Sequence, residues 1–189
     1  MCIRDSRRAA LGVTREVDDG IAAAEHQRAL LDLQARFLGD VDVFRRERRL
    51  VFEGELFKLG GTNKTGRGAQ QLEPRAVHLL SDVLLYSKAK ANGRLQFRRQ
   101  VALAGAKVEP RANSEYAVHI FAIVEESGHV SVFSAHNARA KHEWMARVDA
   151  QIVEATLKAA GEADAGAAGA GAAAAAPADA AARLSLIHI

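Results

Sequence analysis

The chain has 189 residues, of which 49% are hydrophobic, 26% charged and 5% aromatic, a length that accommodates one ordinary domain with flanking segments. No apolar run approaches the roughly 20 residues of a membrane-spanning helix, which excludes such a helix. The single cysteine, Cys2, excludes an internal disulfide and a four-cysteine zinc site. The net charge of +3 is too small to indicate a nucleic-acid-binding protein.

The two ends of the chain do not continue the sequence pattern of the segments next to them. Residues 1–6 and 184–189 resemble translated adapter sequence, and we expect both to be assembly scars on a protein that is longer at both ends. An Ala/Gly-rich segment, 159–183, precedes the second scar, and alanine fills 16 of the 24 positions from 159 to 182. This composition predicts a disordered tail, with a partner-binding helix as the less favoured alternative.

Residues 14–40 contain one long predicted helix that begins after Thr14 and ends at Gly39. Its apolar stripe recurs at spacings of three and four: Val17, Ile21, Ala24, Leu31, Ala35 and Leu38. One apolar stripe needs a partner surface. We therefore expect the last helix of a helical domain that is cut off upstream, only marginally docked in this chain.

Residues 50–136 change to short runs that alternate or are rich in β-branched and aromatic residues, separated by turn formers such as Asn92-Gly93. Seven strands are predicted: Leu50–Leu59, Arg75–Ser81, Val83–Lys88, Leu95–Leu103, Ala106–Pro110, Tyr116–Val124 and His129–Ala135. Consecutive short strands joined by turns predict an antiparallel sandwich or barrel.

Residues 137–158 form a predicted amphipathic helix that Asn137 can cap. Trp144, Val148, Ile152 and Ala155 line one of its faces. The order of elements predicts a mainly β fold with α, in which a seven-stranded antiparallel barrel is capped by a C-terminal helix. Trp144, the only tryptophan, is the expected structural anchor of that cap.

Three motifs give residues 50–158 a resemblance to the pleckstrin homology (PH) domain. Glu53–Leu59 looks like the first strand of that family, and Arg75–Tyr86 is similar to its second and third strands. Lys141–Met145 resembles its terminal helix with the hallmark tryptophan.

The preceding residues extend the resemblance. Leu30–Gly39 followed by Arg48–Leu56 resembles the junction in Dbl-type Rho guanine-nucleotide exchange factors, closest to the FYVE, RhoGEF and PH domain-containing subgroup. The resemblance implies that 14–40 is the C-terminal helix of a truncated Dbl homology domain. It also implies a non-covalent regulator of a Rho-family GTPase, cytoplasmic and peripheral at membranes or cytoskeleton. This fragment would lack the exchange surface.

Positive charge is concentrated in the first half of the barrel. Residues 58–99 carry nine basic residues against Glu73 and Asp82, a net charge of +7, whereas 107–158 has six bases and seven acids. A basic face of this kind favours anionic membranes. The resemblance implies a phosphoinositide or anionic-lipid site at Lys58, Lys64, Arg67, Arg75, Tyr86 and Lys88. Glu73 stands where strong binders carry a base, so we expect weak, largely electrostatic contact.

No arrangement typical of a catalytic, metal or cofactor site occurs in the sequence. The seven histidines are scattered without metal-ligand spacing, and neither a nucleophile elbow nor a cysteine–histidine pair is present. We expect no catalytic residue, metal or cofactor. Two alternatives to an exchange-factor fragment stay open: a stand-alone PH adaptor that binds phosphoinositide membranes, and a PH-like module that binds peptides or proteins.

Overall fold

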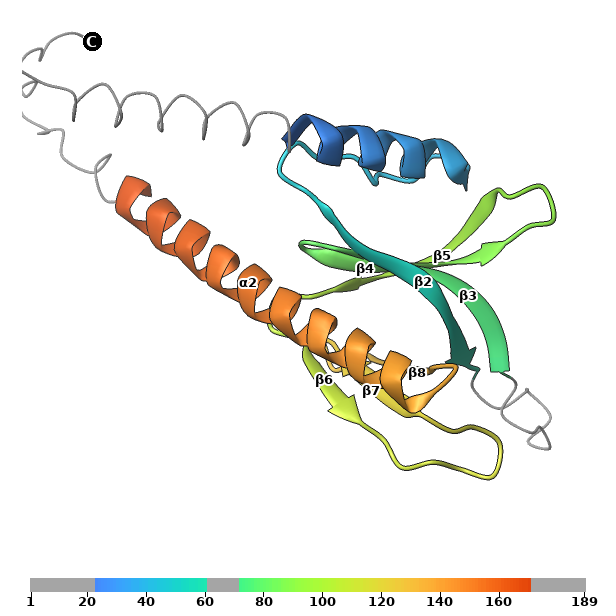
Figure 1. Ribbon diagram of the computed structural model, residues 1–189. Coiled ribbons are helices and arrows are strands. Elements are labelled where there is room, and N and C mark those ends of the chain that lie inside the picture. The colour runs from blue at the N-terminus through green and yellow to red at the C-terminus, as the bar shows by residue number, and fades with distance from the viewer. Residues whose placement is uncertain (1–22, 61–71, 171–189) are drawn as a thin grey trace, which may run out of the picture.

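The structure is a computed structural model that describes residues 23–60 and 72–170, with side chains described through residue 162. The two expected scars, Cys2, Thr14, Lys64, Arg67 and the end of the Ala/Gly-rich segment lie outside the described residues. A helix at 23–36, a strongly bent sheet and the C-terminal helix α2 (Ala138–Ala170) make up the fold (Figure 1).

All seven predicted strands form, with ends that differ by a few residues, and one more short strand precedes them. The strands are β1 (Phe37–Leu38), β2 (Leu50–Leu59), β3 (Leu72–Leu80), β4 (Val83–Ala89), β5 (Leu95–Ala102), β6 (Lys107–Pro110), β7 (Ile120–Val124) and β8 (Val130–Ser134). The extra pairing is parallel, Phe37 with Leu95. It makes the sheet mixed, because the chain leaves the helix at residue 36 and extends along the edge of β5.

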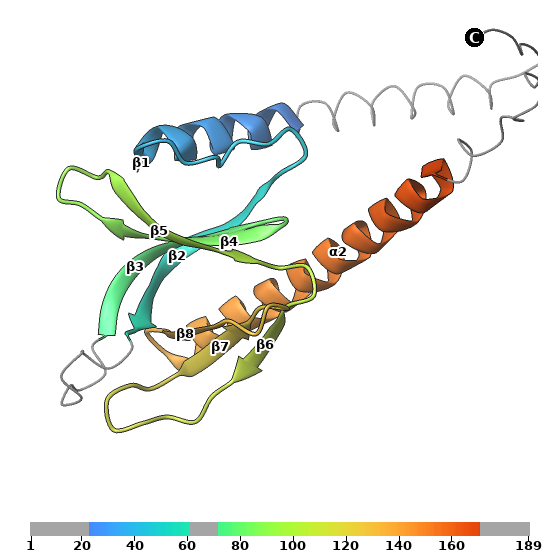
Figure 2. The same ribbon diagram turned by 180° about the vertical axis from the view of Figure 1, so that it is seen from behind.

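The sheet bends into two halves that meet at only two residue pairs, Phe57 with Ser134 and Lys58 with Phe133. Its strand order, β1-β5-β4-β3-β2-β8-β7-β6, leaves β1 and β6 as edges, so the hydrogen bonds among the described strands do not close the barrel. Helix α2 lies along the β6–β8 half and continues past it (Figures 1 and 2). The predicted PH-like fold, a barrel capped by a terminal helix, is confirmed.

The barrel core forms around the indole of Trp144, which is 4% exposed. The Phe52 ring meets it edge-on at 4.8 Å between centroids. Gly54 lets β2 approach this closely, because a Cβ at that position would lie 3.2 Å from the indole. The predicted inner face of α2 is buried along its length: Trp144, Val148, Ile152 and Ala155.

Helix 23–36 is firmly docked, which corrects the expectation of marginal docking. Leu30, Leu33 and Phe37 are at most 3% exposed and pack on the outer face of β3–β5 in a second hydrophobic core. Of the predicted stripe, Ala24, Leu31 and Ala35 lie on the helix with exposed side chains, Leu31 at 53%, whereas Leu38 follows the helix in β1 and is 40% exposed. Val17 and Ile21 lie outside the described residues. Sequence periodicity did not distinguish these two apolar faces, since both have helical spacing.

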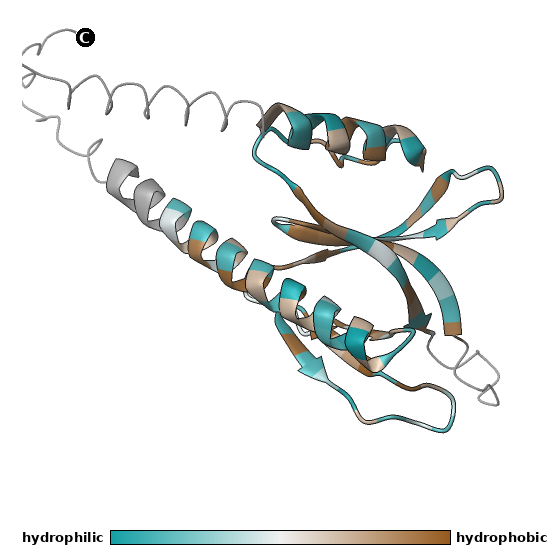
Figure 3. Ribbon diagram, in the orientation of Figure 1, coloured by the Kyte–Doolittle hydropathy of each residue, from teal (hydrophilic) through white to brown (hydrophobic). Residues whose placement is uncertain are grey.

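Helix α2 begins as predicted and ends later. The Asn137 side chain caps it by accepting a hydrogen bond from the Ala140 amide at 2.8 Å. The helix then continues past the predicted end at 158 to Ala170, so the Ala/Gly-rich segment begins inside it. Alanine favours helix strongly enough to extend one that already exists. Hydrophobic and hydrophilic residues alternate along both helices (Figure 3). Among the described residues, no helix is long and apolar enough to cross a bilayer.

Candidate functional site

Basic side chains gather inside the barrel at the end where β2 finishes and β3 begins. Alternation along a strand places Lys58 on the same face as buried Leu56, and Arg75 on the same face as buried Val77. Both therefore point inward at the open end. We call this end the basic mouth, formed by Lys58, Arg75 and Arg99 over the ring of Tyr86.

Lys58 lies among positive charges. Its ammonium group donates a 3.2 Å hydrogen bond to the Leu59 carbonyl and sits 5.6 Å from the centroid of the Phe133 ring. Burial lowers the pKa of Lys58, and the nearby charges of Arg75 and Arg99 lower it further. Three positively charged side chains therefore lie near one another in a partly desolvated place. A bound anion would reduce the electrostatic repulsion among them.

Arg75 is 8% exposed and already has an anionic partner. Its Nη2 donates to a Glu73 carboxylate oxygen and its Nη1 donates to the Pro74 carbonyl at 3.2 Å. Its buried Nε has no hydrogen-bond partner among the described residues. Glu73 stands directly opposite Lys58 in the β2–β3 register, and its side chain is 45% exposed. The acid predicted to weaken phosphate binding thus contacts the guanidinium itself.

Arg99 was not among the predicted site residues. Its Nη2 donates to Glu125 at 2.8 Å, which ties β5 to the end of β7 across the gap that the sheet leaves open. A register shift between Tyr86 and Ser87 interrupts alternation along this hairpin. The neighbouring Arg98 is exposed. Sequence alternation alone could not decide whether Arg98 or Arg99 points inward, because the register shift changes which residues of β5 lie on the inner face of the sheet.

The remaining predicted positions contribute unequally. Tyr86 is 8% exposed and meets the Phe133 ring edge-on at 5.6 Å, so it forms the floor of the basic mouth. Lys88 is exposed near the end of β4. The structure brings Lys58, Arg75 and Tyr86 together and leaves Lys88 exposed, without a hydrogen bond or ion pair to these described residues.

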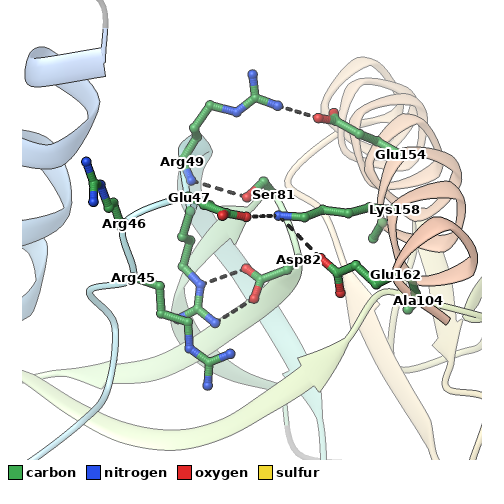
Figure 4. A pocket seen from close by; sticks show the side chains of 13 residues that line it. Arg45, Arg46, Glu47, Arg49, Ser81, Asp82, Ala104, Glu154, Lys158 and Glu162 are labelled. Atoms are coloured by element: carbon green, nitrogen blue, oxygen red, sulfur yellow. Dashed lines mark hydrogen bonds and ion pairs between the residues drawn. The ribbon is translucent and has the colours of Figure 1, made fainter. Parts of the chain in front are cut away.

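A cavity of about 570 Å³ lies at the other end of the barrel, between the 45–49 linker and α2 (Figure 4). Ion pairs span it, from Arg49 to Glu154 and from Lys158 to Glu47. The pairing with Glu47 raises the pKa of Lys158, and the same contact lowers the pKa of Glu47. The charged lining is thus largely satisfied within the chain, and it joins the linker to α2.

Arg48 anchors the same linker. Its side chain is 1% exposed and makes two hydrogen bonds to Asp82, at 2.7 and 2.6 Å. Its Nη1 also donates to the Asp42 and Val43 carbonyls, at 3.2 and 2.9 Å. One guanidinium therefore holds the linker and the β3–β4 turn together, which sets the position of helix 23–36 against the barrel.

A bent, largely antiparallel sheet that is capped by a tryptophan-bearing terminal helix and carries basic side chains at its open end has the architecture of a PH-type domain. The PH domain family model matches residues 50–153, and the chain belongs to this family.

Curated relatives and solved structures match more of the chain than the residues that the family model covers. The chain is 27% identical over 134 residues to FYVE, RhoGEF and PH domain-containing protein 5 of Homo sapiens, covering 70% of this chain and 8% of that protein. It is 30% identical over 145 residues to FERM, ARHGEF and pleckstrin domain-containing protein 2 of Mus musculus, covering 76% and 13%. The DH/PH fragment of PDZRHOGEF, solved in complex with human RhoA, aligns with a TM-score of 0.54, 16% identity and coverage of 78% and 44%. The chain therefore spans a small part of the curated relatives it matches.

Proposed function

We propose that this chain is the PH portion of a Dbl-type Rho guanine-nucleotide exchange factor, preceded by the last helix of its exchange domain. The observation that carries the proposal is the second hydrophobic core, in which Leu30, Leu33 and Phe37 join that helix to the barrel. The linker adds the Arg48–Asp82 contact. Because the helix and the linker are both fixed to the barrel, the orientation of the PH domain is coupled to that of the helical domain to which this helix would belong.

The exposed stripe of the same helix supports this assignment. Leu31 on the helix and Leu38 directly after it, in β1, are large apolar side chains that the barrel leaves exposed, and Ala24 and Ala35 are exposed on the helix as well. A helix that is apolar on two sides is typical of one packed between two partners. In the proposed protein, one partner is the PH barrel and the other is the remainder of the exchange domain.

The basic mouth supports a second role, weak contact with anionic or phosphoinositide membranes. Each Lys or Arg near an anionic surface contributes roughly 1 kcal/mol, and this attraction falls within a Debye length. Glu73 and Glu125 offset two of the three converged cations. The expected contact is therefore salt-sensitive and serves to orient the exchange domain near a membrane.

Liposome co-sedimentation of the full chain tests the membrane role. Neutral, phosphatidylserine-containing and phosphoinositide-containing vesicles are compared at two salt concentrations. We expect binding to anionic vesicles that weakens with salt and falls in Arg75→Gln. Arg45→Gln removes the same charge from the exposed linker at the far end of the barrel and is the matched control. Equal binding to neutral vesicles contradicts the proposal.

The exchange-factor assignment has its own test. Nucleotide release from Rho-family GTPases is followed with and without this chain, and we expect no acceleration, because one helix does not make an exchange surface. A version extended upstream by the adjoining genomic sequence is expected to accelerate release. An upstream sequence that encodes an unrelated domain would favour the stand-alone adaptor instead.

A further inference from the structure

We infer that ion pairs between the 45–49 linker and α2 form a clasp that couples these two segments, so that loosening either one loosens the other. The clasp consists of the Arg49–Glu154 and Lys158–Glu47 ion pairs. The inference goes beyond the proposed function, because it assigns a conformational coupling to the end of the barrel opposite the basic mouth. It does not depend on membrane binding.

The two sides of the clasp come from distant parts of the sequence. Glu47 and Lys158 are 111 residues apart, and Arg49 and Glu154 are 105 residues apart. Their side chains point toward one another across the cavity of about 570 Å³ (Figure 4). Every residue from 45 to 49 is charged, so the linker offers α2 no apolar side chain. Charge pairing therefore connects the linker to α2 across this space.

Hydrogen bonds of the backbone hold the linker side of the clasp. The Arg49 amide donates to Ser81 Oγ at 3.2 Å, and the Ser81 amide donates to the Arg49 carbonyl at 3.0 Å. The Arg48 amide donates to the Arg45 carbonyl at 3.0 Å. Arg49 thus joins the β3–β4 turn through its backbone and α2 through its side chain. A displacement of α2 reaches the linker through Arg49.

Helix α2 gains support from the clasp where it leaves the barrel. Ala155 is 8% exposed, and the Thr156 hydroxyl accepts a hydrogen bond from the Gly105 amide at 3.0 Å. The described side chains after Thr156 are all exposed, and among them only Lys158 forms an ion pair with another element. Gly161 lies in these turns and disfavours helix. The clasp therefore stabilises the turns of α2 that follow the barrel.

The clasp can open without unfolding the barrel. Each of its side chains is at least 48% exposed, and an exposed ion pair adds little to stability by itself. The barrel has a separate core around Trp144. Coupling between two segments is reciprocal, so displacing α2 frees the linker as displacing the linker frees α2. In the proposed exchange factor, the clasp would pass a change at the end of α2 to the linker that follows helix 23–36.

Amide hydrogen exchange, measured by NMR spectroscopy on the full chain, tests the effect of α2 on the linker. Glu154→Lys is expected to raise the exchange rates of the Arg48 and Arg49 amides about fivefold, the factor that corresponds to the loss of one exposed ion pair at the upper end of its usual contribution. Glu143→Lys is the matched control, because Glu143 is 44% exposed on the same helix and pairs with Arg147 there. This control makes the same change of charge and is expected to leave the linker amides unchanged.

The reverse direction uses a substitution in the linker. Glu47→Lys removes the partner of Lys158 and is expected to raise the exchange rates of the α2 amides at 158–162 about fivefold, for the same reason. Asp42→Lys is the control, because Asp42 is an exposed acid that pairs with Arg45 rather than with α2. It is expected to leave the α2 amides unchanged.

Two further measurements identify ion pairing as the cause. Adding Arg49→Glu to Glu154→Lys exchanges the two charges and is expected to reverse most of the increase, as a direct interaction requires. Salt at about 1 M shortens the Debye length to about 3 Å. It is expected to speed exchange in both segments of the unmodified chain and to leave β3, which lies between β2 and β4, unchanged. Thermal unfolding confirms that each variant folds, and Glu154→Gln replaces Glu154→Lys should the latter not fold.

The outcomes separate the clasp from the proposed function. Equal linker exchange in Glu154→Lys and Glu143→Lys overturns the clasp, and so does an effect in only one of the two directions. Faster exchange throughout the barrel in Glu154→Lys would show general loosening and also overturns it. Failure of the upstream-extended chain to accelerate nucleotide release overturns the exchange-factor assignment and leaves the clasp unaffected.

Discussion

Arg48 and Asp82 stand 34 residues apart in the sequence, and their side chains meet in two hydrogen bonds of 2.7 and 2.6 Å. The guanidinium is almost wholly buried, whereas the carboxylate is 39% exposed. The charges of such a pair add little to the free energy of unfolding, but removing Asp82 would leave the buried guanidinium without a negatively charged partner. The contact therefore specifies where the linker lies more than it adds net stability.

The first prediction concerns this contact. Arg48→Ala removes two hydrogen bonds to Asp82 and the donors to the Asp42 and Val43 carbonyls, and the loss of these bonds is expected to lower the free energy of unfolding by about 3 kcal/mol. Urea unfolding followed by circular dichroism measures the loss. Arg45→Ala, whose ion pair is exposed, is expected to change stability by at most about 1 kcal/mol. Similar values for the two variants would show that the linker is not anchored through Arg48.

The docked face of helix 23–36 gives a second, paired prediction. Leu33 is 2% exposed in the second core, and Leu31 is 53% exposed on the same helix. Leu33→Ala is expected to cost about 2–5 kcal/mol by leaving a cavity, and Leu31→Ala about 0.5 kcal/mol or less. Hydrogen exchange across 23–36 is expected to rise in Leu33→Ala only. The reverse order would mean that the helix docks by its other face.

A third prediction concerns the pH dependence of stability. His78 is 2% exposed beneath Phe37, and burial lowers the pKa of His78 from 6.5 to about 4, with Arg36 adding to the effect. Its Nε2 is 3.5 Å from Glu53, and its Nδ1 has no partner among the described residues.

The pKa of His78 is lower in the folded chain than in the unfolded chain, so the unfolded chain binds a proton at a higher pH. The free energy of unfolding is therefore unaffected by His78 above pH 6.5 and decreases as the pH falls from 6.5 toward 4. The loss is on the order of 3 kcal/mol. Urea unfolding at several pH values is expected to show a steeper decline for the unmodified chain than for His78→Leu. Replacing the exposed His136 by leucine is the control, and an unchanged slope in His78→Leu would show that His78 does not titrate in this way.

The fourth prediction concerns the anchor of the C-terminal helix. Trp144→Ala is expected to cost about 3–5 kcal/mol, since the indole fills the barrel between Phe52 and Gly54. Trp144→Phe keeps part of that volume and is expected to cost less. Because tryptophan fluorescence is lost in both variants, circular dichroism follows the transition. Wild-type stability in Trp144→Ala would be incompatible with a core built on this residue.

The sequence predicted the elements well and the contacts between distant elements poorly. Seven strands, the Asn137 cap and the buried face of α2 follow from local alternation, turn residues and helical spacing, which neighbouring residues determine. The short strand at Phe37 was predicted as helix, because its extended form depends on an edge of β5 that lies far along the chain.

In the candidate site, too, the sequence predicted local features and missed contacts between distant side chains. Residue type and strand position, with the family resemblance, singled out Lys58 and Arg75, and strand alternation explains why both face inward. The partnership of Arg75 with Glu73 and the inward turn of Arg99 toward Glu125 depended on side-chain packing and on a register shift between β4 and β5.

The sequence by itself therefore determined the PH barrel, its tryptophan anchor and the concentration of charge in its first half, because these follow from patterns within short stretches. Only the tertiary structure decided which face of helix 23–36 docks and which acidic side chains Arg75 and Arg99 contact. Two faces of similar apolarity differ only in what packs against them, and an ion pair requires two side chains to meet in space.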